Sequence, residues 1–391
     1  MSAGQEQLEP DRIPGAPHPR ETPSLIGQQA AEAVFLEAFN SGRLHHGWLI
    51  TGPRGVGKAT LAWSIARFLL ATPDPDTGGG LFGEPLPAAV PDSLFIDPDH
   101  PVAHRILAGS EPGLKVIRRG GAGSTDRERE KNYADGKFSN DIRVSEIREL
   151  TPFLNLSASE GGRRVVIVDC ADEMNVQAAN ALLKMLEEPP ARTTLLLVSH
   201  QPSRLLPTIR SRCRELRLGP LSVEDLSAAL MQANIAMPNG VEALTTLSSG
   251  SVGEAVRLIN LGGIELYAEL VGMLGALPKL DRARALRLAE TAAARGSEAR
   301  LDLLIGLIEL FLARLARAGA LGHANAGEGA AGEAAAFATL APHAHAARAW
   351  AELAEELGGR MRHGRAVNLD PASLILDTIL KIQQTAQSLT R

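Results

Sequence analysis

Apolar residues change their spacing along the chain, and the change separates two regions. Before about residue 219, short apolar runs such as "GWLITG" (47–52) and "RRVVIVDC" (163–170) alternate with segments of helical periodicity. Runs of this kind, bounded by glycine or charged residues, predict parallel strands buried on both faces. After that point only helical patterns are found, apart from an Ala/Gly-rich stretch at 318–336 that we expect to be a loop or weak helix. The pattern predicts an α/β domain with a parallel sheet, followed by helical domains.

Proline, glycine and the length of each periodic segment suggest where the domains begin and end. The first residues are polar and rich in Pro and Gly, which predicts a flexible tail. A long irregular stretch follows the second predicted helix, and a compact domain seldom contains such a piece unless it is an insertion. We therefore expect a tail (1–24), an α/β core (25–218) with an irregular insertion (about 71–140), a small helical lid (219–263) and an all-helical domain (264–391).

Composition narrows the class of protein. Apolar residues make up 45% of the 391 positions and charged residues 22%, which is typical of a soluble globular chain. The net charge of −5 argues against a molecule that attracts nucleic acid over its whole surface. The only cysteines, Cys170 and Cys213, cannot form a disulfide framework or a four-thiolate zinc site. No apolar run has the length of a membrane span, so we expect a cytoplasmic protein.

The stretch "GPRGVGKATL" at 52–61 has the spacing of a phosphate-binding loop. In such loops glycines, here Gly52, Gly55 and Gly57, let backbone N–H groups point at the phosphates. The lysine, here Lys58, reaches the outer phosphates, and the dipole of the following helix favours negative charge. A predicted strand precedes the loop and a predicted helix follows it. This context favours a phosphate loop by descent over a glycine-rich turn that never had a ligand, and whether this loop binds a nucleotide is a separate question.

The residue after the lysine departs from this pattern. In a working loop it supplies a hydroxyl to magnesium, but here it is Ala59. Thr60 is next, and one residue along a helix rotates the side chain by about 100°. Its hydroxyl should therefore face a different part of the nucleotide. We expect the placement of the metal to be impaired.

The acidic residues after the strand at 163–168 are also unusual. Motor ATPases with this loop carry Asp-Glu after an apolar strand, and the Glu activates the attacking water. Here Asp169 is followed by Cys170, whose thiol is a poor substitute for a carboxylate base. Asp172 and Glu173 could instead be aligned with the acidic pair, although they lie beyond the predicted strand. We favour Cys170 at the base position and keep the second alignment open.

Two further blocks carry a family resemblance. "NALLKMLEEPP" (180–190) and "LLLVSHQPSRLLPTIRSRC" (195–213), with the triplet Ser211-Arg212-Cys213, resemble the clamp-loader branch of the AAA+ ATPases. "LIGQQAA", "LHHGWLITGPRGVGK" and "GSVGEAVRL" extend the resemblance over about residues 25–258. The rest of the chain is similar to that branch only in length and helicity, as expected of its collar domain.

The resemblance gives the departures a common meaning. Active members have an Arg in a Gly-Ser-x-Arg setting that touches the nucleotide, whereas here Gly253 follows Gly250-Ser251-Val252. Ala59 and Cys170 stand at two other positions that the reaction needs. Arg212, by contrast, is retained, and in the family this residue is an arginine finger that reaches a neighbour's nucleotide. The resemblance therefore implies a subunit that serves another subunit's reaction and not its own.

The same family carries a small zinc module of cysteines between the phosphate loop and the acidic strand. The predicted insertion contains no cysteine. His100 and His104 lie four residues apart and could share a helix face, but two imidazoles without thiolates make a weak zinc site. We expect no zinc, and a surface or packing role for both histidines.

The resemblance implies a non-hydrolysing member of the bacterial DNA polymerase III clamp loader. Such a subunit would lie in a ring with gamma/tau and delta subunits and help load the beta sliding clamp onto primed DNA. It would have no ATPase activity alone, would require no cofactor and could hold ATP or ADP without cleaving it. One alternative is an active clamp-loading or DNA-remodelling ATPase that uses Asp172-Glu173 and Thr60. Another is a binding module that senses nucleotide.

Overall fold

The computed structural model describes residues 9–10, 12–72, 90–155, 162–238, 240–294, 296–322 and 327–389. Contacts divide the chain into two compact units. The first comprises Met1–Ile235 with Ser251–Gly253, and the second Ala236–Gly250 with Glu254–Arg391. The expected lid segment is thus divided between them, because its first helix belongs to the first unit and the later ones to the second. Each unit is described by itself.

The first unit is built on a five-stranded parallel sheet with the order β2-β3-β4-β1-β5. The apolar runs predicted as strands at 47–52 and 163–168 form β1 and β3, which are the central strands together with β4. Every residue of β1 and β4 is buried, because helices cover both faces of the sheet. The strands are β1 Gly47–Thr51, β2 Leu114–Ile117, β3 Arg164–Val168, β4 Thr193–Ser199 and β5 Arg214–Arg217.

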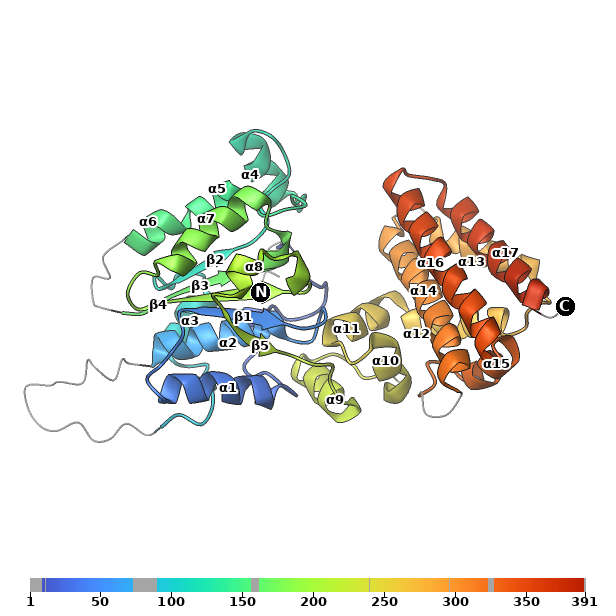
Figure 1. The fold of residues 1–391 in the computed structure, drawn as a ribbon, viewed down its shortest axis with the longest axis horizontal. Helices are drawn as coiled ribbons and strands as arrows, with labels where there is room; N and C mark the ends of the chain where they lie inside the picture. Colours follow the sequence, from blue (N-terminus) through green and yellow to red (C-terminus); the bar gives the residue numbers. More distant parts are fainter. Residues whose placement is uncertain are drawn as a thin grey trace, which may run out of the picture. The chain divides into compact units, whose positions relative to one another are not determined.

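Helices cover the two faces of this sheet as separate layers (Figure 1). One layer contains α1 and α2, and α2 packs against β3 and β4. The other contains α5 to α8, whose apolar side chains form the core with Leu49, Val166 and Leu197 of the sheet. The helices of the first unit are α1 Gln29–Asn40, α2 Lys58–Ala71, α3 Pro101–Leu107, α4 Asp126–Ala134, α5 Val144–Arg148, α6 Leu150–Asn155, α7 Val176–Glu187, α8 Pro207–Arg210 and α9 Val223–Gln232.

The insertion expected to be irregular contains regular elements in its described part, and the expectation is corrected for residues 101–134. It contains α3, the edge strand β2 and α4. A turn at Gly121 contacts α4 so closely that a Cβ there would lie 1.9 Å from the Arg129 carbonyl oxygen. The side-chain amide of Asn132 donates to Ala122 O at 2.7 Å and so links α4 to the turn that precedes it. Within this segment, α3 carries His104, and His100 directly precedes it.

The N-terminal segment also differs from the flexible tail that its composition predicts. The ring of His18 is buried edge-on against Trp63 of α2, with 5.6 Å between ring centroids. Buried Arg67 donates to the Arg20 carbonyl oxygen at 2.9 Å. Glu9 contacts Arg118 at 2.6 Å; burial opposes its ionisation, but His18 and Arg118 lower its pKa to about 2. These contacts hold the described part of the segment on the α/β unit.

The second unit is entirely helical in its described residues. The long helices α14 and α16 pack together, and α13 packs on α17. The interior contains Tyr267, Phe311 and Trp350, and the Trp350 indole N–H donates to Leu340 O at 2.8 Å. The helices are α10 Val241–Ser248, α11 Val252–Leu261, which begins in the first unit, α12 Gly263–Leu274, α13 Arg282–Ala292, α14 Glu298–Leu321, α15 Glu333–Leu340, α16 Ala344–Ala366 and α17 Pro371–Leu389.

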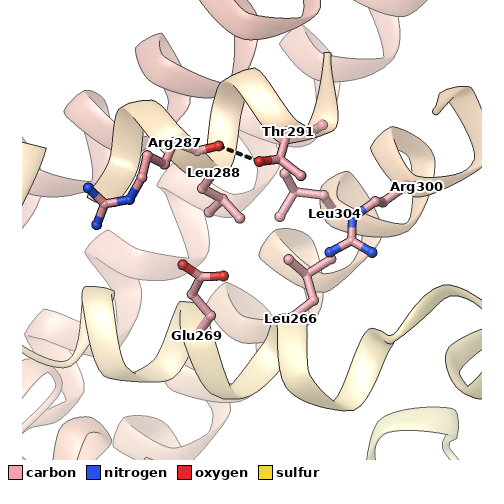
Figure 2. Close-up of a pocket in the computed structure, with 8 residues that line it drawn as sticks. Leu266, Glu269, Arg287, Leu288, Thr291, Arg300 and Leu304 are labelled. Atoms are coloured by element: carbon pink, nitrogen blue, oxygen red, sulfur yellow. Dashed lines mark hydrogen bonds between the residues drawn. The ribbon is translucent and has the colours of Figure 1, made fainter. Parts of the chain in front are cut away.

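A cavity of about 250 Å³ lies inside this helical unit, between α12, α13 and α14 (Figure 2). Leu266, Leu288 and Leu304 form its apolar wall, and Glu269 and Arg300 stand at its edge. Its lining comes from the second unit alone, so it is separate from the phosphate loop. No helix in the described segments has both the length and the apolar character needed to cross a membrane. The predicted fold class, an α/β domain with a parallel sheet and a helical C-terminal region, is confirmed.

Candidate functional site: the phosphate loop and the arginine turn

The phosphate loop connects β1 to α2, as the sequence predicts. Gly52, Gly55 and Gly57 have φ values of 142°, 71° and 100°, a region that favours glycine. A Cβ on Gly52 would also lie 2.5 Å from the Leu218 carbonyl oxygen, so a side chain is excluded there. The loop therefore has the backbone curvature of a phosphate cradle at the start of a helix.

Lys58 is engaged by the loop itself. It is 3% exposed, and its ammonium group donates to Gly52 O at 2.8 Å and to Pro53 O. Burial lowers its pKa to about 8, although the nearby Cys170 and Asp172 act in the opposite direction. A nucleotide phosphate would have to replace these two carbonyl contacts before the lysine could bind it.

The start of α11 lies directly against the loop. The backbone N–H of Gly253 donates to Gly55 O at 3.2 Å, and a Cβ on Gly253 would lie 3.1 Å from Gly55 Cα. The same Cβ would meet Ile13 Cδ1 of the N-terminal segment at 2.7 Å. Glycine at 253 thus permits a backbone contact at the position where the resemblance implies an arginine. An arginine could not take this place without displacing the loop or Ile13.

Cys170 directly follows β3 and Asp169. It is buried and takes up a left-handed backbone conformation, with φ 60° and ψ 53°. Its Sγ lies 3.3 Å from Nε2 of His200, which follows β4. A thiol beside an imidazole thus lies directly after β3, at the position that the resemblance aligns with the carboxylate base.

The other two acidic residues after β3 are bound by neighbouring groups. Asp172 accepts backbone N–H bonds from His200 at 3.0 Å and Gln201 at 3.2 Å, and so ties the ends of β3 and β4 together. Burial opposes ionisation of Asp172, but hydrogen bonds to its carboxylate, foremost that from the His200 backbone N–H, outweigh it and lower the pKa. Glu173 forms ion pairs with Arg119 at 3.0 Å and with Arg54 of the phosphate loop at 3.4 Å. Glu173 does face the loop, yet as the partner of two arginines.

Thr60 and the two histidines of the insertion are the residues considered as metal ligands from the sequence. Ala59 and Thr60 lie in the first turn of α2, half-buried. His100 caps α3 by accepting from Val102 N–H at 3.2 Å, and His104 lies 3.9 Å from Asp99. In the described part of the chain, no group of three His, Cys, Asp or Glu residues could hold a metal ion.

Arg212 lies in the turn between α8 and β5. One terminal nitrogen of its guanidinium donates to Thr208 O at 3.1 Å, and the other lies 2.9 Å from Oε1 of Glu187, the last residue of α7. The side chains of Arg212 and Glu187 are 38% and 44% exposed. The guanidinium is thus fixed at one edge and open to solvent at the other.

Sequence reasoning missed several residues that shape this end of the sheet. Gln28 donates to Gly219 O at 2.8 Å and to Val56 O at 3.3 Å, which links the start of α1 to the phosphate loop. Arg54 and Arg119 reach Glu173 from positions far apart in the chain. No local pattern signals these contacts, because each depends on which loops meet at the carboxyl ends of the strands.

Comparison with known proteins supports the resemblance and names relatives. Residues 94–222 match the family described as DNA polymerase III, delta subunit. The delta' subunit of Pseudomonas aeruginosa is 38% identical over 232 residues, which cover 58% of this chain and 59% of the relative. The delta' subunit of Escherichia coli K12 is 31% identical over 225 residues, 57% of each chain. These alignments span less than three-fifths of the relatives' length.

Another subunit of the same polymerase is also similar. The gamma subunit of Buchnera aphidicola subsp. Schizaphis graminum is 25% identical over 246 residues, 62% of this chain and 58% of the relative. The predicted resemblance to the clamp-loader branch is confirmed, and within it delta' subunits are homologues of this chain.

Proposed function

We propose that this chain, a homologue of the delta' subunits of bacterial DNA polymerase III, is a clamp-loader subunit that does not hydrolyse nucleotide. It would lie in a ring with gamma/tau and delta subunits in the cytoplasm and help place the beta sliding clamp on primed DNA. Its own contribution to ATP hydrolysis would be Arg212, offered to the neighbouring subunit's nucleotide. It would act as part of a polymerase holoenzyme and have no turnover alone.

Three features at the phosphate loop support the non-hydrolysing assignment. Ala59 supplies no hydroxyl to magnesium. Cys170, paired with His200, cannot activate water as a carboxylate would. Gly253 contacts the loop backbone where an arginine would touch a nucleotide. The hydroxyl, the carboxylate and the arginine that these residues replace all serve one reaction. Their joint loss is therefore more informative than the loss of any one of them.

Arg212 is the residue through which this chain would contribute to hydrolysis at the neighbouring subunit's site. A guanidinium that is partly exposed, held at one edge and free at the other, suits transfer of positive charge to a phosphate on another protein. Because Arg212 lies in the turn directly before β5 of the parallel sheet, it can be presented without rearrangement of the core. The combination of an impaired loop and an available arginine is the observation on which the function rests.

Nucleotide binding without cleavage is compatible with this function and not required by it. The three glycines and Lys58 could still hold ATP or ADP once the lysine leaves the two carbonyl groups. An active ATPase is the second candidate, and the Glu173–Arg54 contact favours it because it brings a carboxylate to the loop. Glu173 would have to leave both Arg54 and Arg119 to act as a base, which makes this candidate the weaker one.

Assembly tests the proposed function. When the full chain is co-expressed with gamma and delta subunits, we expect the three proteins to co-elute as one complex in size-exclusion chromatography. The Arg212→Ala variant should co-elute equally well, because that side chain lies on the surface and, among the described residues, contacts Glu187 and Thr208 O. Elution of the wild-type chain alone, with gamma and delta elsewhere, would contradict membership of the ring.

A further inference from the structure

We infer that Glu187 is a positioning residue that sets the orientation of the Arg212 guanidinium for the neighbouring subunit's nucleotide. The inference rests on the proposed function, since it concerns the arginine assigned there. Glu187 is the last residue of α7, which ends because Pro189 and Pro190 cannot continue it. Its Oε1 lies 2.9 Å from a terminal nitrogen of Arg212.

The backbones that carry the two side chains are fixed by close packing at the start of β1. A Cβ on Gly47 would lie 2.9 Å from Leu186 Cδ2 and 3.1 Å from the Arg212 carbonyl oxygen. Leu186 and Ile209, which flank the pair on α7 and α8, are buried. The end of α7 and the turn after α8 therefore have little freedom to move. What remains free is the long Arg212 side chain, with several rotatable bonds.

Two contacts restrict that side chain. A guanidinium is planar and carries five N–H groups in a fixed arrangement. Thr208 O accepts a hydrogen bond from one terminal nitrogen, and the Glu187 carboxylate forms an ion pair with the other, which together restrict the plane and its direction. Within the described residues, the Thr208 contact is a hydrogen bond from one N–H group and the Glu187 contact is an ion pair, so N–H groups remain for a phosphate on another chain. Glu187 thus orients Arg212 without occupying all of its donors.

The Glu187–Arg212 ion pair should affect the rate of ATP hydrolysis at the neighbouring site far more than the folding stability of this chain. An ion pair between partly exposed side chains contributes little to folding, because solvent screens it. An arginine finger, however, must place its charge on a transferring phosphoryl group, and a small misplacement costs a large factor in rate. Loss of Glu187 should therefore leave the fold and the complex intact while it slows hydrolysis at the served site.

The test uses the assembled complex and takes as its readout the part of the ATPase rate that Arg212→Ala removes. Glu187→Gln keeps the size of the side chain and removes its charge, and we expect it to lower that part of kcat about tenfold. The KM for ATP should change less than twofold. Glu187→Asp, which keeps the charge, should recover part of the loss. The unfolding midpoint of the isolated chain should be the same for all variants.

Glu188→Gln is the matched control. Glu188 lies at the same end of α7, is exposed, and its side chain has no ion-pair partner in the part of the chain that the structure describes. It should leave the rate unchanged. If Glu187→Gln matches Glu188→Gln, or raises the rate by releasing Arg212, the positioning role is wrong while Arg212 keeps its function. If Arg212→Ala itself removes nothing, the proposed function fails first.

Discussion

Replacing Arg212 by alanine is expected to slow ATP hydrolysis at the neighbouring subunit's site by about 10³- to 10⁵-fold. The factor corresponds to about 4–7 kcal/mol of activation free energy. The physical reason is the loss of a positive charge at the point where negative charge develops on the transferring phosphoryl group. Steady-state phosphate release by the assembled complex measures it, with the yield of complex recorded in parallel.

Arg210→Ala is the matched control for this substitution. Arg210 is the exposed last residue of α8. Its replacement by alanine removes the same positive charge two residues away from Arg212. We expect the Arg210 variant to hydrolyse ATP at the wild-type rate. Arg212→Lys should stay close to the alanine variant, because an ammonium cannot reproduce the planar two-pronged contact of a guanidinium. Equal rates for wild type and Arg212→Ala would remove the arginine finger from the account.

The largest effect on stability is expected at Glu333, in the helical unit. Its carboxylate is 1% exposed and accepts from Arg314 at 2.8 and 2.9 Å, from Gly329 N–H at 2.6 Å and from the Tyr267 hydroxyl. Glu333→Ala would leave the partly buried Arg314 guanidinium without its carboxylate partner and the buried Tyr267 hydroxyl without its acceptor. Breaking a buried pair from one side in this way costs about 3–5 kcal/mol.

Denaturant unfolding of the full chain, followed by far-ultraviolet circular dichroism, measures this loss. Glu352→Ala is the comparison, because Glu352 lies exposed on α16 and should change the free energy of unfolding by less than about 0.5 kcal/mol. The Glu333 variant should unfold at clearly lower denaturant concentration. Coincident curves for the two variants would mean that the Glu333 cluster does not hold the loop at Gly329 to α12 and α14.

The central strands could be predicted from sequence, whereas β2 could not. The runs that form β1, β3 and β4 are mostly apolar, as burial on both faces requires. Leu114–Ile117 is short, contains a lysine and follows a region rich in proline and glycine. It is a strand because β3 offers it a parallel edge, with Leu114 opposite Val165. Pairing between residues so far apart leaves no local pattern.

The candidate site divides in the same way. The glycine spacing of the loop predicted its curvature, because only glycine suits those φ values. The contacts that occupy the loop were not predictable, since they come from Ile13, Gly253 and the loop's own carbonyl groups. The ordered contacts of the N-terminal segment were not predictable either, and its composition predicted a flexible tail. Composition does not reveal that Arg67 and Trp63 of α2 offer it hydrogen bonds and a ring contact.

ATP hydrolysis by the isolated chain tests the central claim most directly. The claim is that this phosphate loop cannot support cleavage, because the hydroxyl, the carboxylate base and the arginine it needs are replaced by Ala59, Cys170 and Gly253. Purified wild-type protein should release phosphate no faster than its Lys58→Ala variant, which lacks the phosphate-binding ammonium. Turnover by the wild type that disappears in Lys58→Ala would contradict the account, because it would show that this loop hydrolyses ATP by itself.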